Sequence, residues 1–538
     1  MFLKQTRVRS GHRVYTYAQV VESYWDNGRP RHRVLFSLGR IDQLDREMIA
    51  RLAKSLAQLA PGVTIVDGAE DVHAGGAKAC GHTWALTALW EELGLARCLR
   101  EITHGRRIRF DLEAAVRAMV LARLSSPGSE RKVMAWLDGV DLPGSGGLKL
   151  QHLYRALDVM AHEFPKVEAT YLGGLGRLVE VDASLCLLDT TSVSFEGKGP
   201  DGLAEYGYSR DKRPDLRQMV LGVMTSREGL PLGHVVVPGS TVDANTLVEQ
   251  VNILREHVAL TRPVLVFDRG MVSERRLAEL MEDGWEYIAA ARLRTKRART
   301  ALAQSGRYKV VAENLQVKEV QVPGGRPGER LIVCHNPIEA KRDRRERERM
   351  VAKLREMAGS GDGIPKRLLR SVAARRFVTI RGGTVALDMA RIEENARYDG
   401  KWVLRTNTAL PPHEVAERYK GLWRIERAFR TLKSPLEIHP VYHWTERRVR
   451  THVGVCVLAY GILRLAERLV ENAALGISGE EALRTLERVT VDDTVVGGLG
   501  LRVRSDLTTD QQRIFSALHV SPPPRVEPLV ANRSRGPA

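Results

Sequence analysis

The spacing of apolar residues changes along the first 300 residues, and each change predicts a different kind of structure. Residues 1–45 contain two runs rich in aromatic and β-branched residues on either side of Asp26-Asn27-Gly28. An Asn-Gly pair between two such runs is a strong signal for a β-hairpin. Residues 80–178 instead carry apolar residues at helical spacing, broken at residues 125–129. The chain therefore begins with a β module and continues with a helical domain, which either includes a DNA-binding helix-turn-helix or serves only for packing.

From about residue 183 the pattern becomes that of an α/β domain. Apolar runs and amphipathic stretches predict the order strand, strand, strand, helix, strand, helix, strand. These elements are expected at residues 184–196, 217–226, 230–240, 244–260, 263–270, 273–284 and 285–293. Ser273 is the expected N-cap of the second helix. Residues 300–397 interrupt this order with further strands and a highly charged helix, and residues 412–470 are helical again.

At roughly 100–200 residues per domain, a chain of 538 residues is expected to hold three or four domains. The expected segments are an N-terminal β-hairpin module at 1–75, a helical domain and candidate DNA-binding domain at 76–180, the first part of an α/β core at 181–300, a β-rich insertion with a charged helix at 301–397, the second part of the core at 398–475, and a C-terminal helical segment with a flexible tail at 476–538. Residues 521–538 are rich in Pro and lack periodicity, which predicts that this tail is disordered.

The balance of charge points to a polyanionic partner. The 83 Lys and Arg residues exceed the 65 Asp and Glu residues, which gives a formal net charge of +18. Because 43% of the residues are hydrophobic, the chain can bury cores and is not of the disordered class. Nucleic acid is the simplest partner for such a protein, and the alternative is a basic surface kept for solubility. Arg29, Arg31 and Arg33 on the predicted hairpin either touch phosphates or form an ordinary solvated face.

Neither a membrane segment nor a zinc site is expected. No apolar run approaches the ~20 residues that a membrane span needs, and the longest, 453–463, predicts a buried helix. The first residues lack the apolar core of a secretory signal. The five cysteines are scattered without a Cys-x-x-Cys pair, which disfavours a zinc site and suits a reducing compartment. We therefore expect a cytoplasmic protein.

Two acids lie at the polar ends of predicted strands. Asp189 follows the apolar run LCLL, and Asp268 follows the run VLVF. If the two strands are neighbours in one sheet, their carboxylates converge at its edge. Hard oxygen ligands of this kind suit Mg²⁺ or Mn²⁺. The alternative is that each Asp only caps a turn or a helix.

A third acid lies in a strongly basic helical segment, 419–433. In one continuous helix, Tyr419, Arg430 and Lys433 lie within about 40° of Glu426, on one stripe. Residues 418–450 contain nine Lys or Arg and three Glu. A lone acid among cations is expected where the acid holds a metal ion and the cations hold phosphates. The alternative is a surface helix with ordinary Glu-Arg pairs.

The order of these features resembles the ribonuclease-H-like core of DDE transposases from bacterial insertion sequences. Segment 419–433 is similar to the Tyr-Arg-Glu-Lys signature of one large branch, in which two, three and six residues separate the four positions. Tyr419, Glu426 and Lys433 match in type and spacing, whereas Leu422 stands at the Arg position. Neither Arg424 nor Arg430 occupies the same helical angle as that Arg. Other pieces similar to this branch lie at residues 189–192, 267–270, 398–400, 404–407, 441–443 and 450–452.

The resemblance implies a multidomain α/β protein. Its ribonuclease-H-like mixed sheet with helices would be interrupted by a mainly β insertion and preceded by the hairpin module and the helical domain. It also implies two-metal phosphoryl transfer with Mg²⁺, replaceable by Mn²⁺, at two ions per active site. Asp189, Asp268 and Glu426 would be the catalytic and metal-binding residues. The implied partners are double-stranded DNA, as transposon ends and target, and a second copy in a homodimer on paired ends. Such a protein would be associated with the nucleoid.

In this branch the opposite strand is released through a DNA hairpin, which requires a flipped base held by an aromatic side chain. Trp423 is the candidate for that role, and the alternative is that it packs on the core. The expected DNA contacts are Tyr419, Trp423, Arg424, Arg430 and Lys433. Two other functions remain open on the sequence. One is a ribonuclease-H-like endonuclease or resolvase that cleaves without joining, and the other is a non-catalytic, transposase-derived DNA-binding protein.

Overall fold

The computed structural model describes residues 1–26, 29–57, 59, 72–241, 246–247, 249–253, 263–271, 273–293, 295–359, 364–371, 373–381, 384–496 and 499–529. The chain divides into two compact units, and each is described by itself. The first, called the terminal unit, comprises 1–79, 489–507 and 523–538. The second, called the central unit, comprises 80–488 and 508–522.

The terminal unit contains two small sheets. The first is an antiparallel meander of β1 (Phe2–Ser10), β2 (Arg13–Asp26) and β3 (Arg29–Arg40). The expected hairpin is confirmed, because Asp26 pairs with Arg29, while its turn residues lie outside the described part of the chain. Helix α1 (Arg46–Ala57) follows β3 and was not expected.

The second sheet of the terminal unit corrects the expectation for the C-terminal segment. Strands β17 (Thr490–Val496) and β18 (Leu499–Arg504) form an antiparallel pair where only a helical segment and a tail were expected. Their edges are covered by β4 (Val72–Ala74), β5 (Lys78–Ala79) and β19 (Val526–Pro528). The strand β19 lies within the predicted tail, because the free edge of β18 offers backbone partners to that stretch. Residues 530–538 of the tail lie outside the described residues.

A nine-stranded sheet forms the frame of the central unit, in the order β11-β12-β13-β16-β10-β9-β6-β7-β8. Five of these strands are the predicted ones: β6 (Leu185–Ser194), β7 (Gln218–Thr225), β8 (Pro231–Pro238), β9 (Val264–Phe267) and β10 (Tyr287–Ala290). Strand β6 is antiparallel to β7 and parallel to β9, and β10 is parallel to β9. Helix α8 (Glu274–Glu282) follows β9 with Ser273 as its N-cap, as predicted.

The predicted helix at 244–260 is described in part. Residues 246–253, Val248 excepted, are helical, and the rest of that stretch lies outside the described residues. Leu247 and Val251 are one turn apart and both enter the core beneath β6, β9 and β10.

The insertion between β10 and β16 extends the same sheet. Strands β11 (Lys309–Ala312), β12 (Leu315–Val320) and β13 (Arg330–His335) join it through β16 (Lys401–Thr406), which pairs with both β13 and β10. Helix α10 (Pro337–Gly359), a 3₁₀ turn η6 (Ala374–Arg376), the hairpin β14 (Val378–Arg381) and β15 (Thr384–Leu387), and helix α11 (Met389–Ala396) follow β13. Val351, Leu354 and Phe377 give this part a small core of its own.

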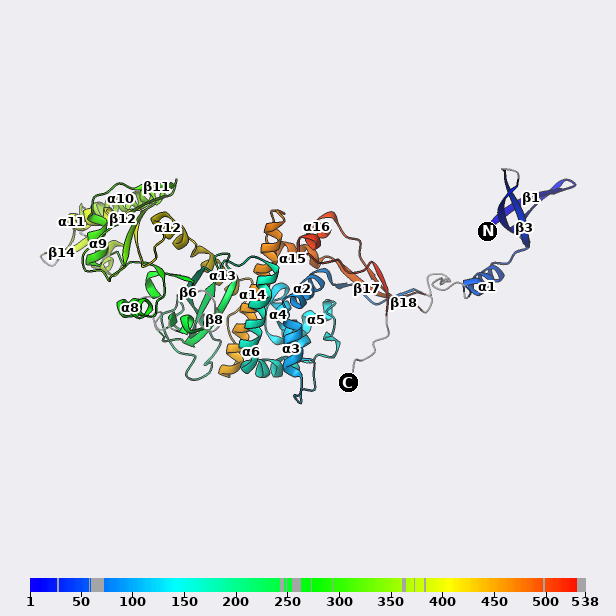
Figure 1. Cartoon of the computed structure of the whole chain (residues 1–538), viewed down its shortest axis with the longest axis horizontal. Helices are drawn as coiled ribbons and strands as arrows, with labels where there is room; N and C mark the ends of the chain where they lie inside the picture. Colours follow the sequence, from blue (N-terminus) through cyan, green and yellow to red (C-terminus); the bar gives the residue numbers. More distant parts are fainter. Residues whose placement is uncertain are drawn as a thin grey trace. The chain divides into compact units, whose positions relative to one another are not determined.

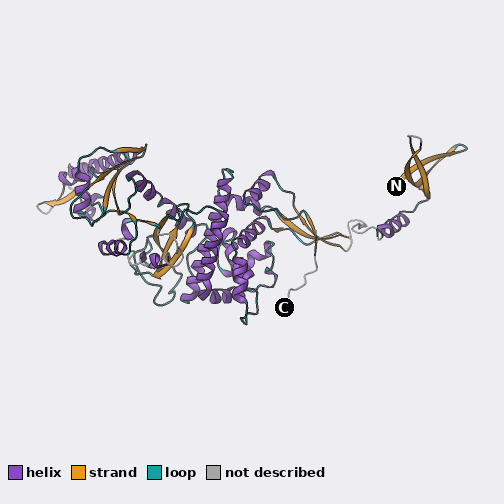
Figure 2. Ribbon diagram, viewed as in Figure 1, coloured by secondary structure: helices purple, strands orange, loops and turns teal. Residues whose placement is uncertain are grey.

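The helical domain packs against one long helix from the C-terminal half of the chain. It contains α2 (Gly81–Glu92), α3 (Leu95–Thr103), α4 (Leu112–Ser125), α5 (Glu130–Gly139) and α6 (Leu150–Leu178). Helix α14 (Glu446–Asn472) lies against α4, α6 and β8, which the ribbon in Figure 1 and the purple helices in Figure 2 both make visible. The run 453–463 is buried in α14, as predicted. Among the described residues, no helix is long and apolar enough to cross a membrane.

Candidate active site

Asp189 and Asp268 emerge from neighbouring strands of the sheet. Strand β6 is buried at every position except Asp189 and Ser194, and the Asp189 side chain is 18% exposed. Strands β6 and β9 are parallel, and their last paired residues are Leu188 and Phe267. Each acid is therefore one residue beyond that pair. This register confirms that the two apolar strands are neighbours in one sheet. Asp189 lies within β6 and not, as the sequence had suggested, at its end.

Each of the two carboxylates is held by a neighbouring side chain. Asp189 Oδ1 accepts hydrogen bonds from the backbone N–H of Thr190, at 2.7 Å, and from Arg210 Nη1, at 3.2 Å. Asp268 is exposed, and its Oδ1 accepts a hydrogen bond from the Tyr419 hydroxyl at 3.1 Å. The structure thus brings together two of the predicted acids and the predicted Tyr.

Glu426 belongs to helix α13 (Trp423–Lys433), which packs across β6 and β7. Ile425, Ala428 and Phe429 are buried against the sheet, whereas Glu426 is exposed in the first turn. Helix α13 therefore lies against β6, the strand that contains Asp189, and leaves the Glu426 side chain exposed. Ligand atoms of the three acids do not all lie within 4.8 Å of one another, since among the described residues only a different trio meets that limit.

The predicted single helix at 419–433 is wrong. It is divided into α12 (Pro412–Lys420) and α13, with Gly421 and Leu422 between them. Backbone hydrogen bonds change there to the i→i+3 pattern, from Leu422 N to Tyr419 O at 3.1 Å and from Arg424 N to Gly421 O at 3.0 Å. Gly has low helix propensity and permits this tighter turn. Tyr419 therefore reaches Asp268 from a different helix than the one that carries Glu426.

The other predicted DNA contacts lie on α13. Trp423 is 51% exposed, so the alternative in which it packs on the core is wrong. The Arg424 guanidinium lies 5.0 Å from the centre of the Trp423 ring, and both residues line a cavity of about 440 Å³. Arg430 is exposed. Lys433 Nζ forms an ion pair with Asp211 at 2.6 Å. Leu422, at the signature Arg position, is buried.

Sequence reasoning missed the loop that connects β6 with β7. Within it, Arg210 bonds Asp189 and also donates to Thr190 Oγ1 at 2.6 Å, while the next residue, Asp211, holds Lys433. Two successive loop residues therefore contact an acid and a cation of the predicted site. The only signal was the charged run Arg210-Asp211-Lys212 in a long connection between two buried strands.

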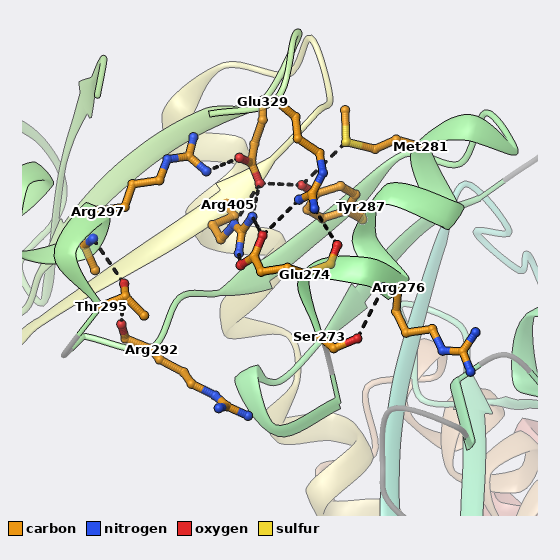
Figure 3. A network of polar contacts seen from close by, with 12 residues as sticks. Ser273, Glu274, Arg276, Met281, Tyr287, Arg292, Thr295, Arg297, Glu329 and Arg405 are labelled. Atoms are coloured by element: carbon orange, nitrogen blue, oxygen red, sulfur yellow. Dashed lines mark hydrogen bonds and ion pairs between the residues drawn. The ribbon is translucent and has the colours of Figure 1, made fainter. Parts of the chain in front are cut away.

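A partly buried ionic network fixes the chain that follows Asp268, and Figure 3 shows its members pointing toward one another. Glu274 begins α8, and Arg405 of β16 donates to it through Nη2 at 3.0 Å. Arg405 Nε also donates to Glu329 at 2.7 Å, and the Tyr287 hydroxyl donates to the same carboxylate at 2.8 Å. Arg297 completes the set with an ion pair to Glu329. The network joins α8 to β10, to β16 and to Glu329, the residue before β13.

His443 and His452 form a buried cluster with Glu130, the one trio in the described residues whose ligand atoms lie within 4.8 Å. His443 Nε2 lies 3.2 Å from Glu130, and His452 Nε2 lies 3.1 Å from the Ile438 carbonyl oxygen. Arg123 Nη2 lies 3.3 Å from the other ring nitrogen of His452. Because the Arg123 cation already occupies this space, the cluster does not suit a metal ion. Both histidine side chains are therefore held by partners within the protein.

This cluster predicts loss of stability in acid. Burial, aided by Arg123, lowers the pKa of His452 to about 3. Burial opposes ionisation of Glu130, but the hydrogen bond and charge of His443 outweigh it and lower its pKa to about 2. An unfolded His binds a proton near pH 6.5, so stability falls as the pH drops from about 6.5 toward 3, and the Glu130 contribution is lost below about 4.5. We expect His452→Gln to flatten melting temperature against pH between 6.5 and 4. The exposed His104→Gln should not, and an unchanged slope in His452→Gln would contradict the assignment.

Comparison with known proteins identifies the family. The family model described as "Transposase DDE domain" matches residues 181–462, just over half of the chain and the whole span from Asp189 to Glu426. The model described as "IS1634 family transposase, N-terminal domain" matches residues 3–64. The chain therefore belongs to the DDE transposases of insertion sequences.

Two individual proteins are similar over part of the chain. One is "Putative transposase y4zB" of Sinorhizobium fredii (strain NBRC 101917 / NGR234), which is 35% identical over 75 residues, or 14% of this chain and 21% of that protein. The chain thus matches about a fifth of the length of this curated relative. The other is the cryo-EM structure of a piggyBac transposase synaptic complex with hairpin DNA. It has a TM-score of 0.39 and 8% identity, over 76% of this chain and 79% of that chain.

Proposed function

We propose that this protein is a DNA transposase of the branch with the Tyr-Arg-Glu-Lys signature, and that it cuts insertion-sequence ends and joins them to a target by metal-dependent phosphoryl transfer. Asp189, Asp268 and Glu426 are the catalytic residues in this proposal. The observation that carries it is the parallel register of β6 and β9, which sets Asp189 and Asp268 at adjacent strand positions, while α13 carries Glu426 across β6.

The order of the core strands supports a ribonuclease-H-like arrangement. Reading β8-β7-β6-β9-β10 across the sheet gives three antiparallel strands followed by two that run parallel to β6. The acids come from the first and fourth strands in chain order and from a late helix. In this proposal residues 181–300 and 398–475 of the central unit together form the catalytic core, and residues 301–397 form the insertion.

The donor set fits divalent metal ions. Three carboxylates with hard oxygen atoms are the ligands that Mg²⁺ and Mn²⁺ prefer. When bound, two such ions would stabilise the attacking and leaving oxygens of an in-line displacement. The chain itself orients two of these ligands, since Arg210 holds Asp189 and Tyr419 holds Asp268. For metal ions to replace these hydrogen bonds, only the Arg210 and Tyr419 side chains, which are exposed or half-exposed, have to turn away.

The cations around the acids would hold the DNA. Arg430 and Lys433 follow Glu426 on α13, and Tyr419 lies beside Asp268. Lys433 is paired with Asp211, so it exchanges that partner for a phosphate when DNA binds. Leu422, at the signature Arg position, is buried between α12 and α13. An Arg placed there would therefore disturb the turn rather than supply a phosphate contact.

Trp423 is proposed to hold a base that leaves the duplex when the hairpin forms. Its ring is half exposed and lies under the Arg424 guanidinium, as a stacking surface for a base requires. We expect Trp423→Ala to leave the first nick intact and to slow hairpin formation about 10- to 100-fold, from the ~1–3 kcal/mol that base stacking contributes. Trp423→Phe should recover part of the rate. Trp444→Ala removes another exposed Trp, outside α13, as the control. Equal hairpin rates in Trp423→Ala and the wild type would contradict this role.

The function is tested with DNA that carries both ends of the element encoding the protein, incubated with Mg²⁺ and a supercoiled target. We expect cleavage at the ends, joining of the freed 3′-OH to the target, and loss of both on chelation of the metal. Cleavage without joining would instead favour an endonuclease or resolvase. Binding without metal-dependent nicking would favour a non-catalytic DNA-binding protein. We propose that the active species is a homodimer on paired ends, acting on chromosomal DNA.

A further inference from the structure

A large cavity lies beside the chain that follows Asp268. Its volume is about 870 Å³, and its walls come from that chain, from α10, and from the region of η6 and α11. Gly270 lines it and is two residues beyond Asp268. Because successive Cα atoms are 3.8 Å apart, the cavity wall begins within about 8 Å of the Cα atom of that acid. The cavity therefore lies beside the proposed active site, and none of the three proposed catalytic acids lines it.

Three arginines on the cavity wall carry charge that the rest of the described chain leaves uncompensated. Arg375 and Arg376 come from η6, and Arg292 comes from the chain after β10. All three side chains are exposed, and no ion pair with an acid is recorded for any of them within the described residues. Figure 3 shows the Arg292 side chain extending away from the ionic network around Glu329.

The acids on the same wall are already engaged. Asp399 is paired with Arg347, and Asp343 accepts a hydrogen bond from the backbone N–H of Gly400 at 2.9 Å. Glu346, which also lines the cavity, lies 4.0 Å from Arg342 of the same helix. The cavity therefore presents an excess of positive charge to any ligand that enters it.

We propose that this cavity binds backbone phosphates of the DNA strand next to the scissile bond, with Arg292, Arg375 and Arg376 as the contacts. The inference rests on the proposed function, because it places the scissile phosphate at the acids. One strand of duplex DNA carries a phosphate for every 3.4 Å or so of helix axis, so a cavity wall that begins within about 8 Å of Asp268 lies within reach of the first phosphates beside the cut. The planar Arg guanidinium matches phosphate geometry with paired hydrogen bonds.

The test compares two double variants that remove the same charge. Arg375→Gln with Arg376→Gln alters the cavity wall, and Arg345→Gln with Arg349→Gln alters exposed arginines of α10 that do not line it. All four side chains are exposed, so neither pair disturbs a core. Binding of a fluorescent duplex carrying an element end is measured by anisotropy in EDTA over a series of salt concentrations.

We expect the cavity pair to weaken binding and to reduce the slope of log K against log salt by about 2, close to 0.9 for each lost phosphate contact. The α10 pair should keep the slope of the wild type. Shortening the duplex on one side of the scissile bond should abolish the difference between the cavity pair and the wild type, whereas shortening the other side should not. Equal slopes in the two pairs, or a difference that survives both truncations, would overturn the proposal.

Failure of this inference can be told apart from failure of the proposed function. If the wild type cleaves and joins DNA but the cavity pair binds with the wild-type slope, the cavity does not hold phosphates and the catalytic assignment stands. Suppose that the slope of log K against log salt is smaller for the cavity pair than for the wild type, but the wild type neither nicks nor joins DNA. The cavity then binds DNA, and the transposase assignment is wrong. Binding of a polyglutamate peptide that is lost in the cavity pair, while the cavity pair binds DNA like the wild type, would point to an acidic protein partner and overturn the proposal.

Discussion

Asp189→Asn should reduce DNA cleavage in Mg²⁺ by about 10³-fold or more while leaving the fold and DNA binding unchanged. The expected size follows from the several kcal/mol that a metal-held charge contributes to such a transition state, at about 1.4 kcal/mol for each factor of ten. The fold should survive because the Asn oxygen can accept the same hydrogen bonds from Thr190 N–H and Arg210 that Asp189 accepts now.

The measurement is the single-turnover rate of end cleavage, with the melting temperature and DNA affinity of each variant beside it. Asp215→Asn is the matched control, because Asp215 lies in the loop between β6 and β7 but is exposed and paired only with Arg213. Its cleavage rate should equal that of the wild type. Full cleavage by Asp189→Asn would remove Asp189 from the metal-binding set.

Glu329→Ala should cause a large loss of stability in the central unit. The Glu329 side chain is fully buried, and burial raises its pKa, but the Arg297 hydrogen bond and the Arg405 charge outweigh burial and hold that pKa below its usual value. Removing the carboxylate leaves two arginines and the Tyr287 hydroxyl without their acceptor. Breaking a buried pair in this way costs about 3–5 kcal/mol.

Glu274→Ala provides the control for that prediction, because Glu274 binds the same Arg405 but its side chain is 71% exposed. Exposed ion pairs contribute about 0–1 kcal/mol, so the melting temperature should fall much less than in Glu329→Ala. Calorimetry of both variants measures the difference. Equal shifts would mean that burial does not set the strength of this network. Cleavage by Glu274→Ala also reports whether the start of α8 must be fixed for Asp268 to act.

Local signals in the sequence were sufficient for the strands that carry the acids. The runs before Asp189 and Asp268 are apolar at nearly every position, as in strands buried on both faces. Strand β9 ends just before Asp268, whereas β6 continues through Asp189 to Ser194. Ser273 was predictable for the same local reason, because its side chain accepts the free N–H of Arg276.

Features that depend on contacts distant in sequence were not predictable. Arg210 contacts Asp189 from a loop without periodicity, and nothing local fixes that loop's path. The split between α12 and α13 arises from a change of two backbone hydrogen bonds at Gly421, which helical periodicity does not register. Strand β17 (TVDDTVV) does not alternate polar and apolar residues, and its partners β4 and β5 lie more than 400 residues earlier in the chain.

The most direct test of the central claim, that Asp189, Asp268 and Glu426 hold divalent metal ions, is the cleavage rate of Asp268→Cys in Mg²⁺ and in Mn²⁺. A thiolate is a poor ligand for Mg²⁺ and a better one for Mn²⁺. Asp268 is exposed beyond the end of β9, so the change leaves the core intact. We predict an inactive enzyme in Mg²⁺ and substantial recovery in Mn²⁺, with Asp215→Cys active in both. Equal activity of Asp268→Cys in the two metals, whether full or absent, would contradict the assignment.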